Sequence, residues 1–444
     1  MGRRILLLGV LAMVALAHPA LAGGGAQGRQ TMQYRLEVRI EPGSHRLEAE
    51  AWIQHPPSPR FYLHQGLIVR QITADGREVS FLREGPSGQL PYVSAGTEVI
   101  AEAPDCQELY VKYAGEIPDI IFGCNLITPD LIELSFYAGW YPAWTGLRDF
   151  DFALQVDLPS GYVTVTNGRP KRSSQRAGRT LSRWESYAPG FDMVLLASPK
   201  LHTLAGVAGD TRVEVYHTSL PESFVQSRVT HLVKALERLT ALYGSPRVKG
   251  VLYLVYSPRE GQGYMRLPLV VISEHRGQTD LGGEFGEARR FRDECHEIAH
   301  FWWALADSST PNDWINEGLA EYSAFRLSEE QYGPAFKELR LREYQQHADS
   351  TQTTDAIAET QGSSPDREVN RYDKATLMLL DMQSRFGVES LDRVLRSLYC
   401  RFAGTHRCCT ADFLSEVKVH IGAEAESAFR EALYRKGRPA TPTQ

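Results

Sequence analysis

The chain has 444 residues and a formal net charge of -6, and 43% of its residues are hydrophobic and 23% charged. This length allows two domains, and the composition is that of a soluble globular protein. The negative net charge and the lack of a dense basic block argue against a nucleic-acid-binding protein.

The first 22 residues predict a signal peptide. Arg3 and Arg4 precede the apolar run ILLLGVLAMVAL, and the ALA sequence at residues 20–22 fits a signal-peptidase site. Because the run is too short to span a bilayer unaided, we expect cleavage after residue 22 and no stable membrane insertion of the mature chain. An uncleaved anchor is the alternative. The expected location is secreted or periplasmic, in a bacterium, with residues 23–31 as a linker.

Export makes the six cysteines candidates for disulfide bonds. Cys295 directly precedes His296 and is expected to be a buried thiol rather than a metal ligand. Six cysteines allow 15 connectivities, so only local pairs are predicted. Local pairing would join Cys106 with Cys124, and Cys400 with Cys408 or Cys409.

Residues 32–204 predict an antiparallel β-domain. Short segments that alternate in polarity or are rich in β-formers are separated by turn sequences such as PSG and NGRP. These segments are QYRLEVRI, RLEAEAWIQ, ELYVKYAG, FDFALQVDL and YVTVTNG.

Residues 205–438 predict a second, mostly α-helical domain, followed by a disordered tail at residues 439–444. Apolar residues from Val225 to Leu239 recur at spacings of four and three, between Pro221 and Gly244, which indicates an amphipathic helix. The segment VKGVLYLVYS then indicates a buried strand. Further helices are expected around His296, around Glu317, from Asp373 to about Phe386, and as a group after Glu389.

The sequence HEIAH, residues 296–300, predicts a metal-binding helix. Residues four apart share a helix face, so His296 and His300 can direct both imidazoles at one ion. Glu297 lies beside that ion and suits a general base for an attacking water. Catalytic zinc usually has three protein ligands, and the following segment NDWINEGLAEY offers Glu317 and Glu321 on one face. Gly318 leaves room for close helix approach.

HEIAH followed by NDWINEGLAEY resembles the zinc site of the alanyl aminopeptidase family, which includes the leukotriene hydrolases and belongs to the gluzincins. LSFYAGWYPAW, VDLPSGYVTVTNG, RYDKATLMLLDM and FREALYRKGRP are similar to other parts of that family. The resemblance implies a β-domain followed by a thermolysin-like, mostly helical zinc peptidase domain, here without the helical C-terminal domain of many members.

The same resemblance implies one Zn²⁺ per chain, held by His296, His300 and Glu317. Glu297 would take a proton from the water and later deliver it to the leaving amine. Tyr372 matches the tyrosine that stabilises the oxyanion, and its implied role is to donate a hydrogen bond to charge that develops in the tetrahedral state. From the residues alone, Tyr372 is one of 20 tyrosines, and a packing role is the alternative.

Three departures from the family pattern stand out. The interval from His300 to Glu317 is two residues shorter, which we attribute to the loop DSST, and FWW replaces Gln-Trp-Phe, with Trp302 and Trp303 expected in the core. The exopeptidase motif Gly-Ala-Met-Glu-Asn corresponds to GYMRL at residues 263–267. Arg266 therefore stands where the family has the glutamate that holds the substrate ammonium, and a permanent cation would repel that group.

The remaining motif residues Gly263, Tyr264, Met265 and Arg266 are expected to bind substrate, as an edge strand that aligns an extended peptide. Arg266 could pair with a substrate carboxylate; a solvated surface position is the alternative. The expected function is an exported zinc metallopeptidase, acting on peptides or proteins and not restricted to free N-termini. Alternatives are an aminopeptidase that uses another acid, with Glu260 or Glu274 as candidates, a non-catalytic zinc-containing peptide-binding protein, and a hydrolase of a non-peptide substrate.

Overall fold

A computed structural model describes residues 31–86, 96–118, 125–144, 148–259, 263–274, 285–352 and 354–437. The predicted signal peptide and C-terminal tail, Cys124 and Glu260 lie outside the described residues. The chain folds into two compact units, Gly24–Ala304 with Ala320–Arg340, and Leu305–Leu319 with Leu341–Gln444. Among the described residues, no helix is both long and apolar enough to cross a membrane.

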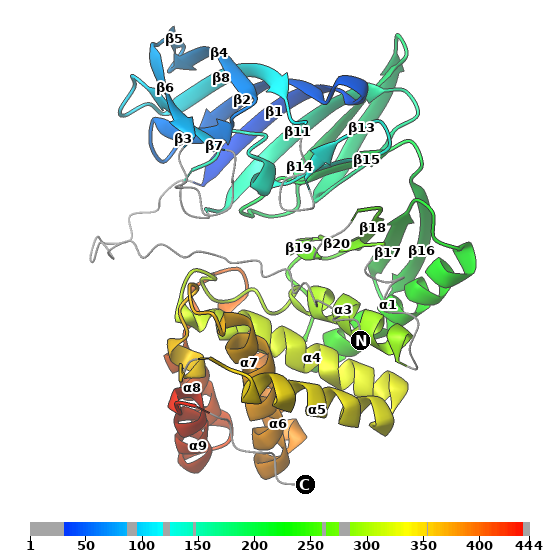
Figure 1. Cartoon of the computed structure of the whole chain (residues 1–444), viewed down its shortest axis with the longest axis vertical. Helices are drawn as coiled ribbons and strands as arrows, with labels where there is room; N and C mark the ends of the chain where they lie inside the picture. The colour runs from blue at the N-terminus through cyan, green and yellow to red at the C-terminus, as the bar shows by residue number, and fades with distance from the viewer. Residues whose placement is uncertain are drawn as a thin grey trace, which may run out of the picture. The chain divides into compact units, whose positions relative to one another are not determined.

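The first unit contains an eight-stranded sheet in the order β13-β14-β11-β1-β2-β8-β4-β5 (Figure 1). Its strands follow the predicted alternation: in β1, Tyr34, Leu36, Val38 and Ile40 are buried and the residues between them are more exposed. All pairs are antiparallel except β1 with β11, which is parallel. The strand bounds are β1 Met32–Glu41, β2 Arg46–Gln54, β4 Leu67–Ala74, β5 Arg77–Glu78, β8 Glu108–Glu116, β11 Phe150–Pro159, β13 Gly168–Arg176 and β14 Arg179–Ser186.

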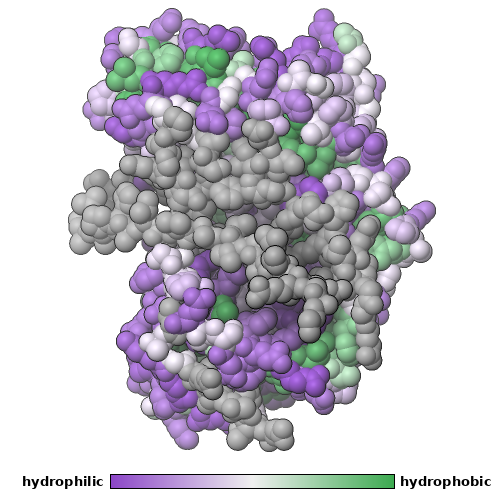
Figure 2. Space-filling view, viewed as in Figure 1, coloured by the Kyte–Doolittle hydropathy of each residue, from purple (hydrophilic) through white to green (hydrophobic). Residues whose placement is uncertain are grey.

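Two smaller sheets complete the β-domain and share its hydrophobic core. One has the order β12-β15-β10-β9, and the other β3-β7-β6. The bounds are β3 Arg60–His64, β6 Phe81–Pro86, β7 Gly96–Ala101, β9 Leu126–Ile127, β10 Ile132–Leu134, β12 Val163–Thr166 and β15 Leu195–Ser198. The predicted β-domain is confirmed. On the face in Figure 2, hydrophilic residues predominate among the coloured atoms.

A five-stranded sheet in the order β16-β17-β18-β20-β19 follows in the chain. β18 is buried along its whole length, as predicted from its continuous apolar sequence. Residue 204, the predicted domain boundary, lies inside β16. The bounds are β16 His202–Ala208, β17 Thr211–His217, β18 Val251–Ser257, β19 Tyr264–Arg266 and β20 Leu269–Ser273.

The predicted helices are present, and one helix among the described residues was missed. α1 runs from Glu222 to Tyr243 and packs on β16, β17 and α3, with its apolar stripe buried and Gly244 at its C-terminal end. α5 was not predicted. The bounds of the other helices are α3 Gly286–Ala299, α4 Trp314–Tyr332, α5 Pro334–Asp349, the π-helix η6 Val369–Lys374, α6 Ala375–Phe386, α7 Val388–Phe402, α8 Thr410–His420 and α9 Ala423–Tyr434.

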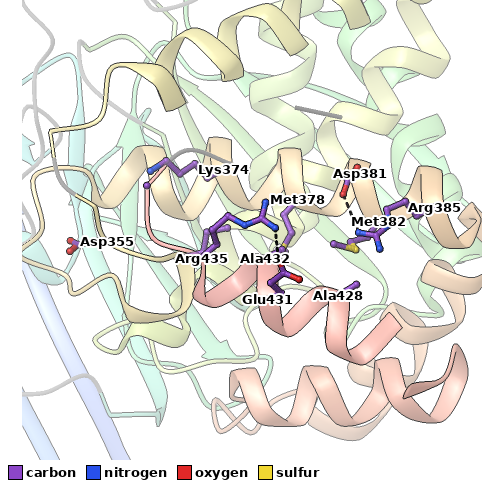
Figure 3. A pocket seen from close by; sticks show the side chains of 12 residues that line it. Asp355, Lys374, Met378, Asp381, Met382, Arg385, Ala428, Glu431, Ala432 and Arg435 are labelled. Atoms are coloured by element: carbon purple, nitrogen blue, oxygen red, sulfur yellow. Dashed lines mark hydrogen bonds and ion pairs between the residues drawn. The ribbon is translucent and has the colours of Figure 1, made fainter. Parts of the chain in front are cut away.

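In the second unit, α6, α9 and the segment near Asp355 line a pocket of about 70 Å³ that is open to solvent (Figure 3). Met378 and Met382 line it together with two ion pairs along the helices, Arg385 with Asp381 and Arg435 with Glu431. No catalytic, metal-binding or substrate-binding residue predicted from the sequence lines this pocket.

The cysteine expectations are partly wrong. Cys400, Cys408 and Cys409 carry free thiols, so the expected local bond is not formed. Cys400 is exposed on α7, whereas Cys408 is buried and Cys409 accepts and donates hydrogen bonds in the N-terminal cap of α8. Cys106 is a free thiol, and its expected partner lies outside the described residues. Cys295 is fully buried, as expected, and burial raises the pKa of its thiol well above the usual value.

Candidate metal centre

Helix α3 presents both histidines of HEIAH. His296 is in its last turn, and His300 is its C-terminal cap, still with helical backbone angles (φ -62, ψ -11). The two imidazole centroids are 4.9 Å apart and the ring planes are nearly perpendicular, at 88°. The helical spacing of four therefore brings the two rings together as predicted.

Nδ1 of each imidazole forms a hydrogen bond. Nδ1 of His296 lies 3.0 Å from Oε2 of Glu321, and Nδ1 of His300 lies 3.1 Å from the carbonyl oxygen of Trp303. A carboxylate and a carbonyl can only accept, so each Nδ1 carries the hydrogen and each Nε2 keeps its lone pair. This is the tautomer that a metal-binding histidine requires.

Glu317 is the candidate for the third ligand. Ligand atoms of His296, His300 and Glu317 all lie within 4.8 Å of one another, and these three form a possible metal-binding group among the described residues. Two imidazole nitrogens and one carboxylate oxygen are a donor set that suits catalytic zinc and leaves a coordination position open. The predicted ligand residues are therefore brought together, and they fit zinc.

Glu321, the other carboxylate on α4, has a different environment. It is 1% exposed, and Arg292 Nη1 donates to both of its oxygens, at 2.6 and 2.8 Å, while Arg340 donates at 3.3 Å. Burial alone would raise the pKa of Glu321, but Arg292, His296 and Arg340 hold it well below the usual value. Glu321 is therefore an ionised residue that orients His296; sequence analysis offered it only as an alternative third ligand and did not predict this role.

Glu297 lies next to the segment predicted to bind substrate. A Cβ atom placed on Gly263 would lie 3.2 Å from Oε1 of Glu297 and 3.1 Å from the carbonyl oxygen of Val271. A larger residue at position 263 would crowd the Glu297 carboxylate. The close approach explains why the motif has glycine there, and it places the start of β19 beside the candidate base.

Tyr372 lies in the π-helix η6 and hydrogen bonds to Glu317. Burial, followed by the Glu317 carboxylate, raises the pKa of the Tyr372 phenol well above its usual value, so the hydroxyl stays protonated and can donate. Gly318 permits this arrangement, because a Cβ atom there would lie 2.7 Å from Cβ of Ala375 and 3.0 Å from the carbonyl oxygen of Arg371. Room for close helix approach at Gly318 is confirmed.

Arg371 anchors the backbone next to Tyr372. Its guanidinium donates to Oδ2 of Asp313 at 2.6 Å and to the carbonyl oxygens of Thr310 and Thr360 at 3.0 and 3.1 Å. Asp313 and Arg371 are 1% and 0% exposed in their side chains. These bonds tie η6 to the turn that precedes α4, the helix of Glu317. The signal for them was Asp313 in the NDWINEG segment, which was quoted without a role.

The Arg266 side chain is neither exposed to solvent nor an unpaired cation. Its Nε donates to Oδ2 of Asp192 at 2.8 Å, and its other nitrogens donate to Met265 and Tyr137. The guanidinium lies within 6 Å of four aromatic rings, those of Phe136, Tyr137, Phe191 and Tyr264. Direct pairing of Arg266 with a substrate carboxylate does not fit this arrangement, because Asp192 already occupies the guanidinium.

Other acids near this strand are also occupied. Glu274, a candidate for holding a substrate ammonium, is 1% exposed and accepts hydrogen bonds from Thr218 and Ser219. Glu133 is fully buried and accepts from Arg259, from Ser257 and from the hydroxyl of Tyr264 on β19. Neither carboxylate is placed to receive a substrate amine.

No family model matches the sequence. The human aminopeptidase RNPEPL1 is 27% identical over 191 residues, which are 42% of this chain and 25% of that protein. The chain thus matches about a quarter of the length of this curated relative.

Solved structures match nearly the whole chain. An M1 zinc metallopeptidase from Deinococcus radiodurans, bound to a Tyr-Ser-Ala substrate, has a TM-score of 0.69 at 18% identity, covering 93% of this chain and 96% of that one. Native yeast LTA4 hydrolase has a TM-score of 0.70 at 14% identity, covering 93% and 69%. The chain therefore has the fold of the M1 zinc metallopeptidases, a β-sheet domain followed by a helical domain.

Proposed function

We propose that this chain is an exported, zinc-dependent metallopeptidase that hydrolyses peptide bonds. The carrying observation is the group of His296, His300 and Glu317, with Glu297 between the histidines in sequence and Tyr372 hydrogen bonded to Glu317. When bound, zinc supplies a Lewis acid that polarises the scissile carbonyl and lowers the pKa of water. The export step rests on the predicted signal peptide alone.

The chain's own residues divide the remaining work. Glu297 takes the proton from the attacking water and returns it to the leaving amine, since its carboxylate lies beside the substrate-facing strand at Gly263. The Tyr372 hydroxyl donates a hydrogen bond to the substrate oxygen on which negative charge develops. This bond stabilises the transition state more than the bound substrate. β19, residues Tyr264–Arg266, pairs with β20 and aligns the peptide backbone along its other edge.

The same proposal includes substrates without a free N-terminus. Position 266 holds a cation that Asp192 neutralises, and Glu133 and Glu274 are each occupied by other donors. Among these described acids, an ammonium beside the scissile bond would therefore find no available anionic partner, and burying it unpaired is costly. The sequence suggested a substrate carboxylate as the partner of Arg266, but in the structure its partner is the Asp192 carboxylate.

A conventional aminopeptidase is the second candidate, because the curated relative carries that name and a similar structure holds a tripeptide. Mass spectrometry of cleavage sites in a mixed pool of free and N-acetylated peptides separates the two. We expect internal cleavage of acetylated peptides by zinc-loaded protein and none after chelation. Stepwise release of N-terminal residues from free peptides alone would favour the aminopeptidase. Zinc binding without any cleavage would leave a peptide-binding protein.

A further inference from the structure

Two buried arginines lie over the same phenylalanine ring where α1 packs against α3, outside the metal centre. On α1, Phe224 and Arg228 are four residues apart, and on α3, Arg290 and Glu294 have the same spacing, so each pair lies on one helix face. α1 and α3 pack together. The guanidinium carbons of Arg228 and Arg290 lie 5.7 and 4.5 Å from the centroid of the same Phe224 ring.

Both arginines are removed from water. Arg228 is 0% exposed and Arg290 is 6% exposed. The buried acid in the group is Glu294, whose Oε2 lies 3.6 Å from Nε of Arg228 and whose Oε1 accepts the hydroxyl of Tyr256. Glu287 lies 3.8 Å from Nη2 of Arg228, but its side chain is 54% exposed, so solvent screens this charge. Two buried cations thus share one buried carboxylate.

Several donors of these arginines are buried without a hydrogen-bond partner among the described atoms: Nη1 and Nε of Arg228, and Nε and Nη2 of Arg290. Nε of Arg228 has Oε2 of Glu294 3.6 Å away, beyond hydrogen-bond distance, whereas no carboxylate oxygen of the described residues lies nearer to the other three donors. Nη2 of Arg228 does have an acceptor, Nδ1 of His231. Buried donors on charged groups are nearly always satisfied, and leaving them unsatisfied is costly. The nearby rings of Phe224 and Phe291 attract a cation weakly but offer no acceptor atom in the plane of a guanidinium.

We propose that Arg228 and Arg290 together bind one small inorganic monoanion, such as chloride, over Phe224. A monoanion accepts hydrogen bonds from several N–H groups at once and supplies the negative charge that the buried group lacks. A water molecule would accept from at most two of the donors and would leave the charge unbalanced.

The site bears on the metal centre through α3. Arg290 and Glu294 precede His296 on the same helix, by six and two residues. An anion between α1 and α3 would hold α3 against its neighbour and so stabilise the helix that carries both histidines. The proposal does not depend on peptidase activity, because anion binding is measured separately from turnover.

Thermal unfolding of the zinc-loaded mature chain tests this directly. Wild type is titrated with sodium chloride at constant ionic strength made up with sodium gluconate, whose anion is much larger than chloride. We expect a saturable rise in Tm of about 1 °C, the shift that about 1 kcal/mol of binding free energy gives a chain of this length, because the unfolding entropy is about 2.1 cal/mol/K per residue. Arg290→Gln should lose this chloride dependence. Arg238→Gln is the matched control, because Arg238 is an exposed arginine on α1 paired with Glu330, and it should retain the dependence.

A crystal grown in sodium bromide gives an independent readout that needs no variant. An anomalous peak between the guanidinium groups of Arg228 and Arg290 is the expected result. A Tm that does not respond to chloride, a response that Arg290→Gln retains, or ordinary water density without anomalous signal at this place would each overturn the proposal.

Discussion

Replacing Glu321 with glutamine would remove one negative charge from a buried carboxylate that binds Arg292, Arg340 and Nδ1 of His296. The side chain keeps its size, but its amide can no longer hold the His296 imidazole as strongly or balance two guanidinium groups. Loss of such a partner of a metal-binding histidine costs 10–100-fold in metal affinity, which is about 1.4–2.7 kcal/mol. We expect Glu321→Gln to bind zinc in that weakened range while still reaching one zinc per chain at saturation.

Competition with a calibrated chelator measures this affinity, with Glu317→Gln as the comparison. Because Glu317 is assigned as a ligand, Glu317→Gln should lose more affinity than Glu321→Gln. Arg238→Gln is the control, because Arg238 is an exposed arginine paired with Glu330, and this variant should bind zinc as tightly as wild type does. A larger loss in Glu321→Gln than in Glu317→Gln would refute the assignment and make Glu321 the third ligand.

Three further predictions follow from the same geometry. Tyr372→Phe should retain zinc and lower kcat by about 10²–10³-fold, as measured in steady-state kinetics, because it removes one donor to the oxyanion; an unchanged kcat would return Tyr372 to a packing role. Gly318→Ala should lower the free energy of unfolding by about 1–3 kcal/mol in a denaturant titration, because the added Cβ lies 2.7 Å from Cβ of Ala375; unaltered stability would mean that η6 can move away freely. Acid should release zinc in a metal assay, because both histidines must be neutral to bind it, and retention of zinc at low pH would argue against imidazole ligands.

The Arg266→Glu substitution is informative only when Asp192, the ion-pair partner of Arg266, is replaced as well. Alone it would place a second carboxylate beside Asp192, which is fully buried and would lose its counter-ion. Arg266→Glu combined with Asp192→Asn restores one negative charge at this position. We expect the double variant to cleave free N-termini better relative to acetylated peptides than wild type does. No change in that ratio would show that the charge at position 266 does not set the preference.

The pairing of the two imidazoles and the β-strands were predictable because their signals are local. HEIAH puts two imidazoles on one helix face, and alternation in segments such as β1 assigns one face of each strand to the core. α5 was missed because its buried face includes Arg340, a residue that apolar periodicity does not count. The sequence does have one clue to the buried ion pairs around Glu321. Arg292 is four residues before His296 and so lies on the ligand face of the helix, where a cation requires an acid nearby.

Pairings between distant residues were not predictable. Arg266 and Asp192 are 74 residues apart, and Arg371 and Asp313 are 58 apart. A sequence identifies the charges but not which of many acids a given arginine meets, since that depends on how the strands and helices pack. The error on Arg266 came from treating a cation at a substrate position as available to the substrate. The error on Cys400 came from treating nearness in sequence as nearness of the two sulfur atoms.

Cleavage of a defined peptide pool by wild type and by Glu297→Gln, each loaded to one zinc per chain, tests the central claim most directly. If Glu297 is the base, the variant should keep its zinc and lose turnover by about 10²–10⁴-fold, the usual contribution of a general base. Equal turnover by the two proteins, or no cleavage by zinc-loaded wild type, would contradict a peptidase that works through Glu297.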